Sequence, residues 1–368
     1  MLNVVLILLL VALACPLAAS VIPLALPAAG QRLAPVPLEL TVPDLKGSYT
    51  IPYIQSDTDL RVRVVFPPGG PTRARLILIM GDQPIAERDA TPADPDITIE
   101  GLHPAEYRLR LGGLGEGDQI VCSATWRQFA VGTIIGAIGD SITEGYHGHG
   151  FWRDDLNLRA DMFPPEAVSK DGRNFPQYSP TTAWHRPDIN CFQSWMTDLN
   201  NLLTQKWDQP FFIANEGYGG ISTGATLNTM RNDKGWQARM KLLRPQVWLI
   251  HLGVNDERAK VPAADVGRNL EAIVSLLIQD YGAEPHRIVV ARPCYDYAEG
   301  AEAILKSYIA EIDALVARRG LRPGPDFFAA YAVERAKWYG DDPVHPNIAG
   351  MEYMAQLWAE AIGTAALR

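Results

Sequence analysis

Ser141, Asp342 and His345 are the residues whose types and spacing could support acyl transfer. Ser141 lies in the run GDSITEG, directly after an apolar stretch. Asp342 and His345 are three apart on a loop that contains Pro343 and Pro346. A carboxylate this close can hold an imidazole in one tautomer, and the other ring nitrogen can then take a proton from a serine hydroxyl. The combination favours a serine nucleophile with a histidine base.

Two further segments could stabilise the negative charge that develops during acyl transfer. In NEGYGGIS the glycines would let backbone N–H groups approach a ligand closely. In LGVND the side-chain amide of Asn255 could donate to an oxyanion. Each piece alone also fits an ordinary role, such as an N-cap serine, a turn glycine or an Asx turn. Their occurrence together and in this order is what favours catalysis.

The elements that must position these segments follow from the hydrophobic pattern after residue 132. Short apolar runs alternate with helical patterns, which predicts a parallel sheet covered on both faces, with ligands beyond the carboxyl ends of its strands. His251, inside an apolar run, is interpreted as a hydrogen-bonded core residue. The expected strands are 133–138, 210–214, 247–252, 287–291 and 326–330, and the expected helices are 191–207, 265–281, 301–319 and 348–362.

The preceding hundred residues follow a different pattern, with short alternating runs separated by turns rich in proline and glycine. This pattern predicts a small β-sandwich that serves as an accessory or packing module. The letters LHPAEY resemble the tyrosine corner of fibronectin type III and immunoglobulin-like sandwiches, in which the hydroxyl of Tyr107 would bond to the backbone. The expected strands are 48–54, 60–66, 75–80, 96–99, 107–111 and 119–129.

The first 31 residues contain no charged side chain, and their compact apolar run is interrupted by prolines. We interpret 1–29 as a secretory signal peptide, cleaved between Ala14 and Ala29. Cys15 weakly resembles a lipoprotein acylation site, so a lipidated or uncleaved anchor is the alternative. The expected organisation is then this segment, a β-sandwich at 30–131 and an α/β domain at 132–368, in a secreted or cell-envelope protein.

Charge and cysteine content narrow the expected partners. The chain has 33 Lys and Arg against 42 Asp and Glu, a net charge of -9, and no basic cluster, which argues against nucleic acid. Membrane contact is expected only through the N-terminal segment. Cys122, Cys191 and Cys294 lack metal-ligand spacing and are expected to be buried free thiols. No metal and no cofactor is expected.

The conjunction of motifs from about residue 132 to 368 resembles the SGNH (GDSL-type) hydrolase family. The resemblance implies a flavodoxin-like three-layer α/β fold. It also implies that Ser141 is the nucleophile, that Asp342 and His345 complete the triad, and that no cofactor takes part. In the oxyanion hole it places the backbone N–H of Ser141, Asn255 and Gly220; the NxGxxG spacing that starts at Asn215 favours Gly220 over Gly219.

The substrate is expected from the same resemblance. GDSITEG, WLIHLGVND and HPN look most like carbohydrate acetylesterases within the family. An aromatic-rich insertion of about 65 residues after Gly145 would form a wall of the cleft or a surface Ω-loop. We therefore expect a carbohydrate O-acetylesterase acting on a small-molecule or polysaccharide ester. The alternatives are a lipase, lysophospholipase or thioesterase of the same fold, and a carbohydrate-binding surface protein with a degenerate hydrolase domain.

Overall fold

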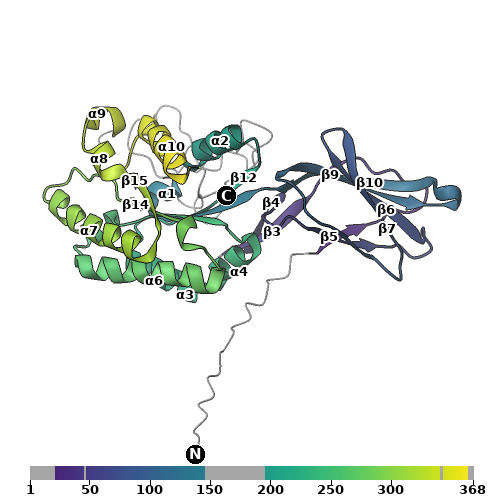
Figure 1. Cartoon of the computed structure of the whole chain (residues 1–368), viewed down its shortest axis with the longest axis horizontal. Coiled ribbons are helices and arrows are strands. Elements are labelled where there is room, and N and C mark those ends of the chain that lie inside the picture. Colours follow the sequence, from purple (N-terminus) through teal and green to yellow (C-terminus); the bar gives the residue numbers. More distant parts are fainter. Residues whose placement is uncertain (1–20, 45–46, 146–194, 340–342, 364–368) are drawn as a thin grey trace, which may run out of the picture.

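The computed structural model describes residues 21–44, 47–145, 195–339 and 343–363, which form a strand-rich N-terminal region and a C-terminal α/β region (Figure 1). Residues 146–194, which make up most of the predicted insertion, lie outside the described residues, as do Asp342 and Cys191. Within the described ranges, no helix has both the length and the apolar character that crossing a membrane requires.

The α/β region is built on a five-stranded parallel sheet. Its strand order is β12-β11-β13-β14-β15, so the first strand in sequence lies between the second and the third. This is the flavodoxin-like order, which confirms the predicted fold class. The strands are β11 (Thr133–Gly139), β12 (Phe211–Gly217), β13 (Val247–His251), β14 (Ile288–Arg292) and β15 (Arg322–Asp326).

Helices cover both faces of this sheet, which is why β11 and β13 are buried along their whole length (Figure 1). One face packs on α3 (Thr223–Asn232), α4 (Lys234–Leu243), α6 (Ala263–Tyr281) and α7 (Ala301–Arg319). The other packs on α2 (Trp195–Trp207), α8 (Phe327–Tyr331) and α10 (Ile348–Ile362). The short helices are α1 (Ser141–Glu144), α5 (Val254–Arg258), α9 (Arg335–Trp338) and the 3-10 turns η1 (Glu116–Asp118) and η6 (Pro285–Arg287).

The N-terminal region consists of two sheets whose buried side chains form one apolar core. In that core the hydroxyl of Tyr107 donates to the carbonyl of His103 at 2.6 Å, the bond expected of a tyrosine corner. The smaller sheet contains β1 (Ile22–Ala25), β5 (Leu60–Val65) and β8 (Asp96–Ile99). The larger contains β2 (Val36–Pro37), β3 (Glu39–Asp44), β4 (Gly47–Gln55), β6 (Arg73–Met80), β7 (Gln83–Ala90), β9 (Ala105–Leu114) and β10 (Ile120–Val131).

Strand β1 lies inside the segment 1–29 that the sequence assigned to the signal peptide. It pairs in parallel with β5, and the side chains of Ile22 and Leu24 are buried in the core between the two sheets. The folded N-terminal region therefore begins at least as early as Ile22, and a cleavage site after this residue would remove a packed strand.

One expected strand, 326–330, is a helix. Asp326 accepts a hydrogen bond from the backbone N–H of Ala329 and so caps α8, which begins at Phe327. The actual strand, β15, precedes it and contains Pro323 and Pro325, which an edge strand tolerates because its outer side forms no ladder. The strand prediction was wrong because the capping role of Asp326 was not recognised.

The two regions share part of one core. Val42, Ile51 and Ile54 pack with the face of the α/β sheet that α3 and α4 cover. An ion pair of 3.1 Å between Arg244 and Asp57 lies at the same junction. The strand-rich region is therefore attached to the α/β region by apolar packing as well as by the chain itself.

Candidate active site

Ser141 lies at the carboxyl end of β11, as the first residue of α1. The carboxylate of Asp140 accepts a hydrogen bond of 3.0 Å from the backbone N–H of Ile142 and caps this turn. Gly145, with a φ of 114°, ends the helix in the left-handed region that favours glycine. The turn holds Ser141 in a nearly buried position at the carboxyl end of the sheet. In this fold, ligands bind at the topological switch point, where the strand order reverses.

His345 meets Ser141 from the C-terminal end of the chain. Its Nε2 lies 2.8 Å from the Oγ of Ser141, a hydrogen-bond distance. The loop is fixed on its C-terminal side by Asn347, which caps α10 by accepting from the N–H of Gly350 and also donates to the carbonyl of Lys337. The structure thus brings together two predicted site residues that are 204 positions apart; Asp342, the third, lies outside the described residues.

The glycine segment after β12 is tied to the turn that holds Ser141. Asn215 donates to the carbonyl of Glu144 at 3.3 Å and accepts from the N–H of Gly217 at 3.0 Å. A Cβ on Gly217 would lie 2.3 Å from the backbone nitrogen of Glu144, so no other residue fits there. Gly220, the predicted donor, follows with a φ of 76° and open space around it. This close approach, together with the bond from Asn215 to Glu144, holds the segment beside the serine turn.

Asn255 lies beside the same glycine segment. Its side-chain amide donates to the carbonyl of Ile221 at 3.1 Å. An amide nitrogen has two hydrogens, so this bond orients the side chain and leaves the second hydrogen for a ligand. The structure therefore places Asn255 next to the loop that contains Gly220, as the oxyanion-hole prediction requires.

Asp256 directly follows Asn255, and the sequence did not predict its place in the network beside the candidate site. Its fully buried carboxylate accepts hydrogen bonds from the backbone N–H of Thr223 at 2.9 Å and from the hydroxyl of Thr223 at 2.6 Å. Asn269 donates to that hydroxyl at 3.1 Å. Burial raises the pKa of Asp256, and the bonds from Thr223 oppose the rise. This network joins the turn that contains Asn255 to the start of α3. The only signal of the network in the sequence is the acidic residue that follows Asn255 in LGVND.

Burial also shifts the pKa values of two groups near the carboxyl ends of the strands. It raises the pKa of Asp140 to about 6, against the effect of the bond from Ile142. It lowers the pKa of His251 to about 4. Neither ring nitrogen of His251 has a hydrogen-bond partner in the described part of the chain, and the ring packs edge-on against Phe327. His251 is a core residue as expected, but its ring does not form the expected hydrogen bonds with any described residue.

The cysteines that the structure describes are buried free thiols, as expected for Cys122 and Cys294. Burial raises the pKa of the Cys294 thiol well above its usual range. Among the described residues, no group of three histidine, cysteine or acidic side chains is placed to hold a metal ion.

Among known proteins, the model of the GDSL-like Lipase/Acylhydrolase family matches residues 137–353 of this chain. The lipase/acylhydrolase from Enterococcus faecalis is 17% identical, with 62% of this chain and 95% of that one covered and a TM-score of 0.42. Axe2, an acetylxylan esterase from Geobacillus stearothermophilus, is 16% identical, with 64% and 97% covered and a TM-score of 0.44. No curated protein matches the chain.

Proposed function

Because the chain belongs to the GDSL-like lipase/acylhydrolase family, we propose that it is a serine esterase that removes O-acetyl groups from carbohydrates. The observation that carries the esterase part is the distance of 2.8 Å between the Oγ of Ser141 and the Nε2 of His345. At this distance the imidazole is placed to take the hydroxyl proton as the serine attacks.

The proposed reaction proceeds through an acyl-enzyme. As His345 takes the proton, the Oγ of Ser141 forms a bond to the ester carbonyl carbon. Collapse of the tetrahedral intermediate breaks the bond to the alcohol, which receives the proton from His345. Water then gives a proton to His345 as its oxygen attacks the acyl carbon. Collapse of the second tetrahedral intermediate breaks the bond to the Oγ of Ser141, which takes the proton back from His345, and the acid is released. Asp342 is proposed to orient the imidazole.

The oxyanion of both tetrahedral intermediates is proposed to accept hydrogen bonds from three donors. These are the backbone N–H groups of Ser141 and Gly220 and the side chain of Asn255. The tie between Asn255 and the carbonyl of Ile221 supports this role, because it holds the amide beside the glycine loop before substrate arrives. Donors that are fixed in advance need no reorganisation as charge develops.

The carbohydrate part of the proposal is supported by the motif resemblance and by the chemistry at the edge of the site. Tyr218 follows Gly217 directly and is 48% exposed, so a ring with a polar tip lies beside the glycine loop. Aromatic rings with polar tips suit surfaces that are partly apolar and partly hydroxylated, as sugars are. The same proposal includes export of the protein by an N-terminal signal peptide that contains residues 1–20.

The esterase proposal is tested by hydrolysis of 4-nitrophenyl acetate. We expect turnover in the parent protein and its loss in Ser141→Ala. Ser123→Ala is the matched control, since Ser123 is also nearly buried but lies in the N-terminal region. Equal turnover in the parent and in Ser141→Ala would refute the nucleophile.

A panel of substrates tests the acetyl and sugar parts. The parent should prefer acetate over octanoate among 4-nitrophenyl esters, and should release acetate from acetylated xylan. A preference for octanoate would instead support the lipase or thioesterase alternative. Binding to xylan without turnover of any ester would support the non-enzymatic alternative.

A further inference from the structure

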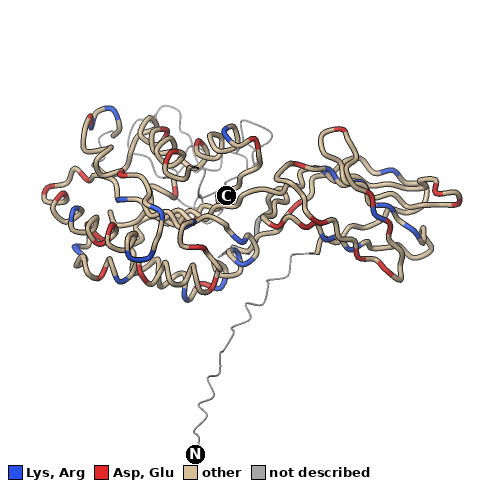
Figure 2. Tube along the Cα trace, viewed as in Figure 1, with Lys and Arg blue, Asp and Glu red and all other residues tan. Residues whose placement is uncertain are grey.

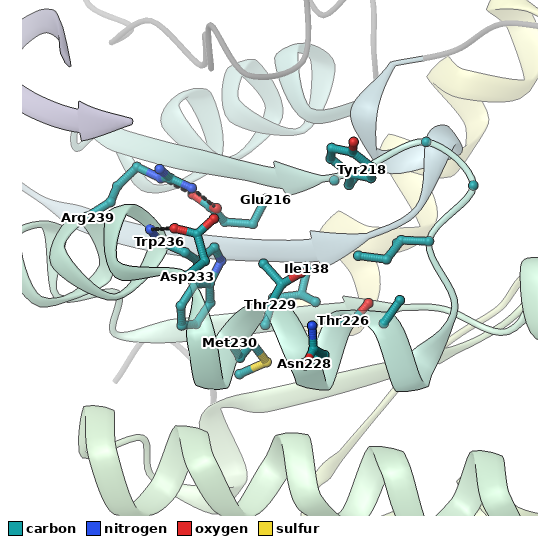
Figure 3. A pocket seen from close by; sticks show the side chains of 15 residues that line it. Ile138, Glu216, Tyr218, Thr226, Asn228, Thr229, Met230, Asp233, Trp236 and Arg239 are labelled. Atoms are coloured by element: carbon teal, nitrogen blue, oxygen red, sulfur yellow. Dashed lines mark hydrogen bonds and ion pairs between the residues drawn. The ribbon is translucent and has the colours of Figure 1, made fainter. Parts of the chain in front are cut away.

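A pocket of about 420 Å³ opens beside the glycine loop, on the sheet face that α3 and α4 cover (Figure 3). The proposed oxyanion donor Gly220 is part of its wall, as are Tyr218 and Ile221. Ser141 and His345 do not line it. A group bound here would therefore lie next to the ester carbonyl without including the reacting atoms. The volume of the pocket is within the range of small-molecule sites, which is about 300–1,000 Å³.

One wall of this pocket carries a buried ion pair. Arg239 donates to both oxygens of Glu216, at 2.8 and 2.5 Å, and the two side chains are only 4% and 3% exposed (Figure 3). Arg239 also donates to the carbonyl of Pro43 at 3.2 Å, so β3 of the N-terminal region braces the wall. A charge pair held this firmly is a preformed feature of the pocket rather than a flexible surface contact.

A second carboxylate gives the pocket an excess of negative charge. Asp233 caps α4 by accepting from the backbone N–H of Trp236 at 2.9 Å, and it also lines the pocket. The charged side chains of the lining are thus two carboxylates, Asp233 and Glu216, and one guanidinium, Arg239. An anionic ligand would be repelled, and a long acyl chain would cover Asp233 with hydrocarbon, which costs free energy.

The rest of the lining combines apolar surface with polar groups. Ile138, Met230 and Trp236 supply the apolar part. Asn228 accepts from Asn232 through its side-chain oxygen at 2.8 Å, which leaves its amide hydrogens for a ligand. A neutral sugar matches this mixture, because its hydroxyls can donate to carboxylates and its C–H faces can cover apolar side chains.

We propose that this pocket binds a neutral glycosyl unit of the acetylated substrate, and that its carboxylates discriminate against uronic acid units. The proposal rests on the proposed function, since the glycosyl unit is the alcohol part of the ester. It assigns the choice of sugar to α3, the start of α4 and the ion pair braced by the N-terminal region.

A substitution that fills the pocket tests its occupancy. Ala225 is exposed on α3 and lines the pocket, so Ala225→Phe places a ring inside it. We expect the ratio of kcat/KM for acetylated xylo-oligosaccharide to kcat/KM for 4-nitrophenyl acetate to fall at least about tenfold, through KM for the sugar. The control is Arg231→Phe, which adds the same ring to an exposed position of the same helix outside the lining.

A second variant tests the charge. Asp233→Asn removes one negative charge and keeps a good N-cap residue. We expect the parent to favour acetylated xylo-oligosaccharide over acetylated oligogalacturonide, and this preference to shrink by about three- to tenfold in Asp233→Asn, as removal of one nearby like charge implies. The preference should also weaken as salt is added to the parent.

The outcomes separate this proposal from the proposed function. If the parent hydrolyses 4-nitrophenyl acetate through Ser141 but the two ratios are the same in parent and variants, the pocket proposal is wrong and the esterase stands. If Ala225→Phe selectively impairs 4-nitrophenyl octanoate, the pocket holds an acyl chain and the glycosyl assignment is overturned. If the parent hydrolyses no ester, the proposed function itself fails.

Discussion

Charged side chains are exposed in both regions, but among the described residues only the α/β region also buries them. In the N-terminal region Lys, Arg, Asp and Glu are spread along the chain (Figure 2), and their ion pairs are partly or largely exposed. Arg63 and Asp96, for example, pair at 2.6 Å with side chains that are 59% and 51% exposed. In the α/β region Asp140, Asp256 and the Glu216–Arg239 pair are almost fully buried. All of these buried groups lie at or near the carboxyl ends of the strands.

Burying charged groups lowers stability, so this difference indicates which region is adapted to function. An exposed ion pair contributes about 0–1 kcal/mol and costs little to keep. A buried carboxylate must instead be hydrogen-bonded or protonated, because its desolvation costs several kcal/mol. Such groups are common at functional sites, since the same burial that costs stability tunes pKa values and fixes geometry. From this comparison we assign the proposed site to the strand ends of the α/β region and a scaffold role to the N-terminal region.

Among the substitutions that test this comparison, Asn255→Ala is expected to have the largest effect, a loss of kcat. Asn255→Ala removes a proposed donor to the oxyanion, and we expect kcat for 4-nitrophenyl acetate to fall by roughly 10²–10³. Because the carbonyl of Ile221 also loses its partner, the free energy of unfolding should be measured in parallel. A loss of stability without a loss of kcat would mean that Asn255 has a structural role and not a catalytic one.

The next effect is expected at Asp256. Asp256→Ala leaves the buried backbone N–H of Thr223 without its acceptor, which should lower the free energy of unfolding by about 1–3 kcal/mol. Since Asp256 joins the Asn255 turn to the start of α3, we also expect a fall in kcat with little change in KM. Thr223→Val keeps the backbone N–H bond and should show a smaller loss in both measurements. Full activity in Asp256→Ala would contradict the positioning role.

A smaller effect, which depends on pH, is expected at His251. Its pKa of about 4 lies below that of the unfolded chain, so unfolding takes up a proton, and stability is lost as pH falls from about 6.5 toward 4. His251→Leu should remove this loss, which is on the order of 2 kcal/mol between about pH 7.5 and pH 5.

Denaturant unfolding of parent and variant at both pH values isolates this contribution. Asp140 acts in the opposite direction, because burial raises its pKa to about 6 and its contribution to stability grows as pH falls from about 6 to 4. The difference between variant and parent cancels Asp140. His286→Leu is the control, since His286 is exposed, and an equal effect there would refute the account.

The smallest effect is expected in the N-terminal region. Arg63→Ala breaks an exposed ion pair, and we expect no measurable change in the free energy of unfolding and no change in esterase activity. A measurable change in either quantity would break the contrast between the two regions.

The sequence predicted the parts of the fold that follow from strong periodicity. The fully buried strands β11 and β13 and the helix α7 were predicted almost to the residue, because apolar runs and helical spacing specify them directly. Strand β7 was missed because it is an exposed edge strand without apolar alternation. Helix α3 was also missed, since its sequence is largely polar and its start depends on the cap of Ser222.

For the site, the sequence predicted which residues meet but not what holds them. Ser141 and His345 were paired from motifs alone, and the structure places them in contact. The network of Asp256 with Thr223 and the brace from Arg239 to Pro43 join segments far apart in the chain. Such contacts between distant segments leave no local pattern, so only the folded structure reveals them.

The measurement that tests the central claim most directly is covalent labelling of the serine. A fluorophosphonate ester reacts with a serine only where a base activates it, and it leaves a stable adduct that peptide mass spectrometry locates. We expect one adduct per chain, on Ser141, with labelling abolished in Ser141→Ala and strongly slowed in His345→Ala. Labelling of a different residue, or equal labelling in the parent and in His345→Ala, would contradict the account.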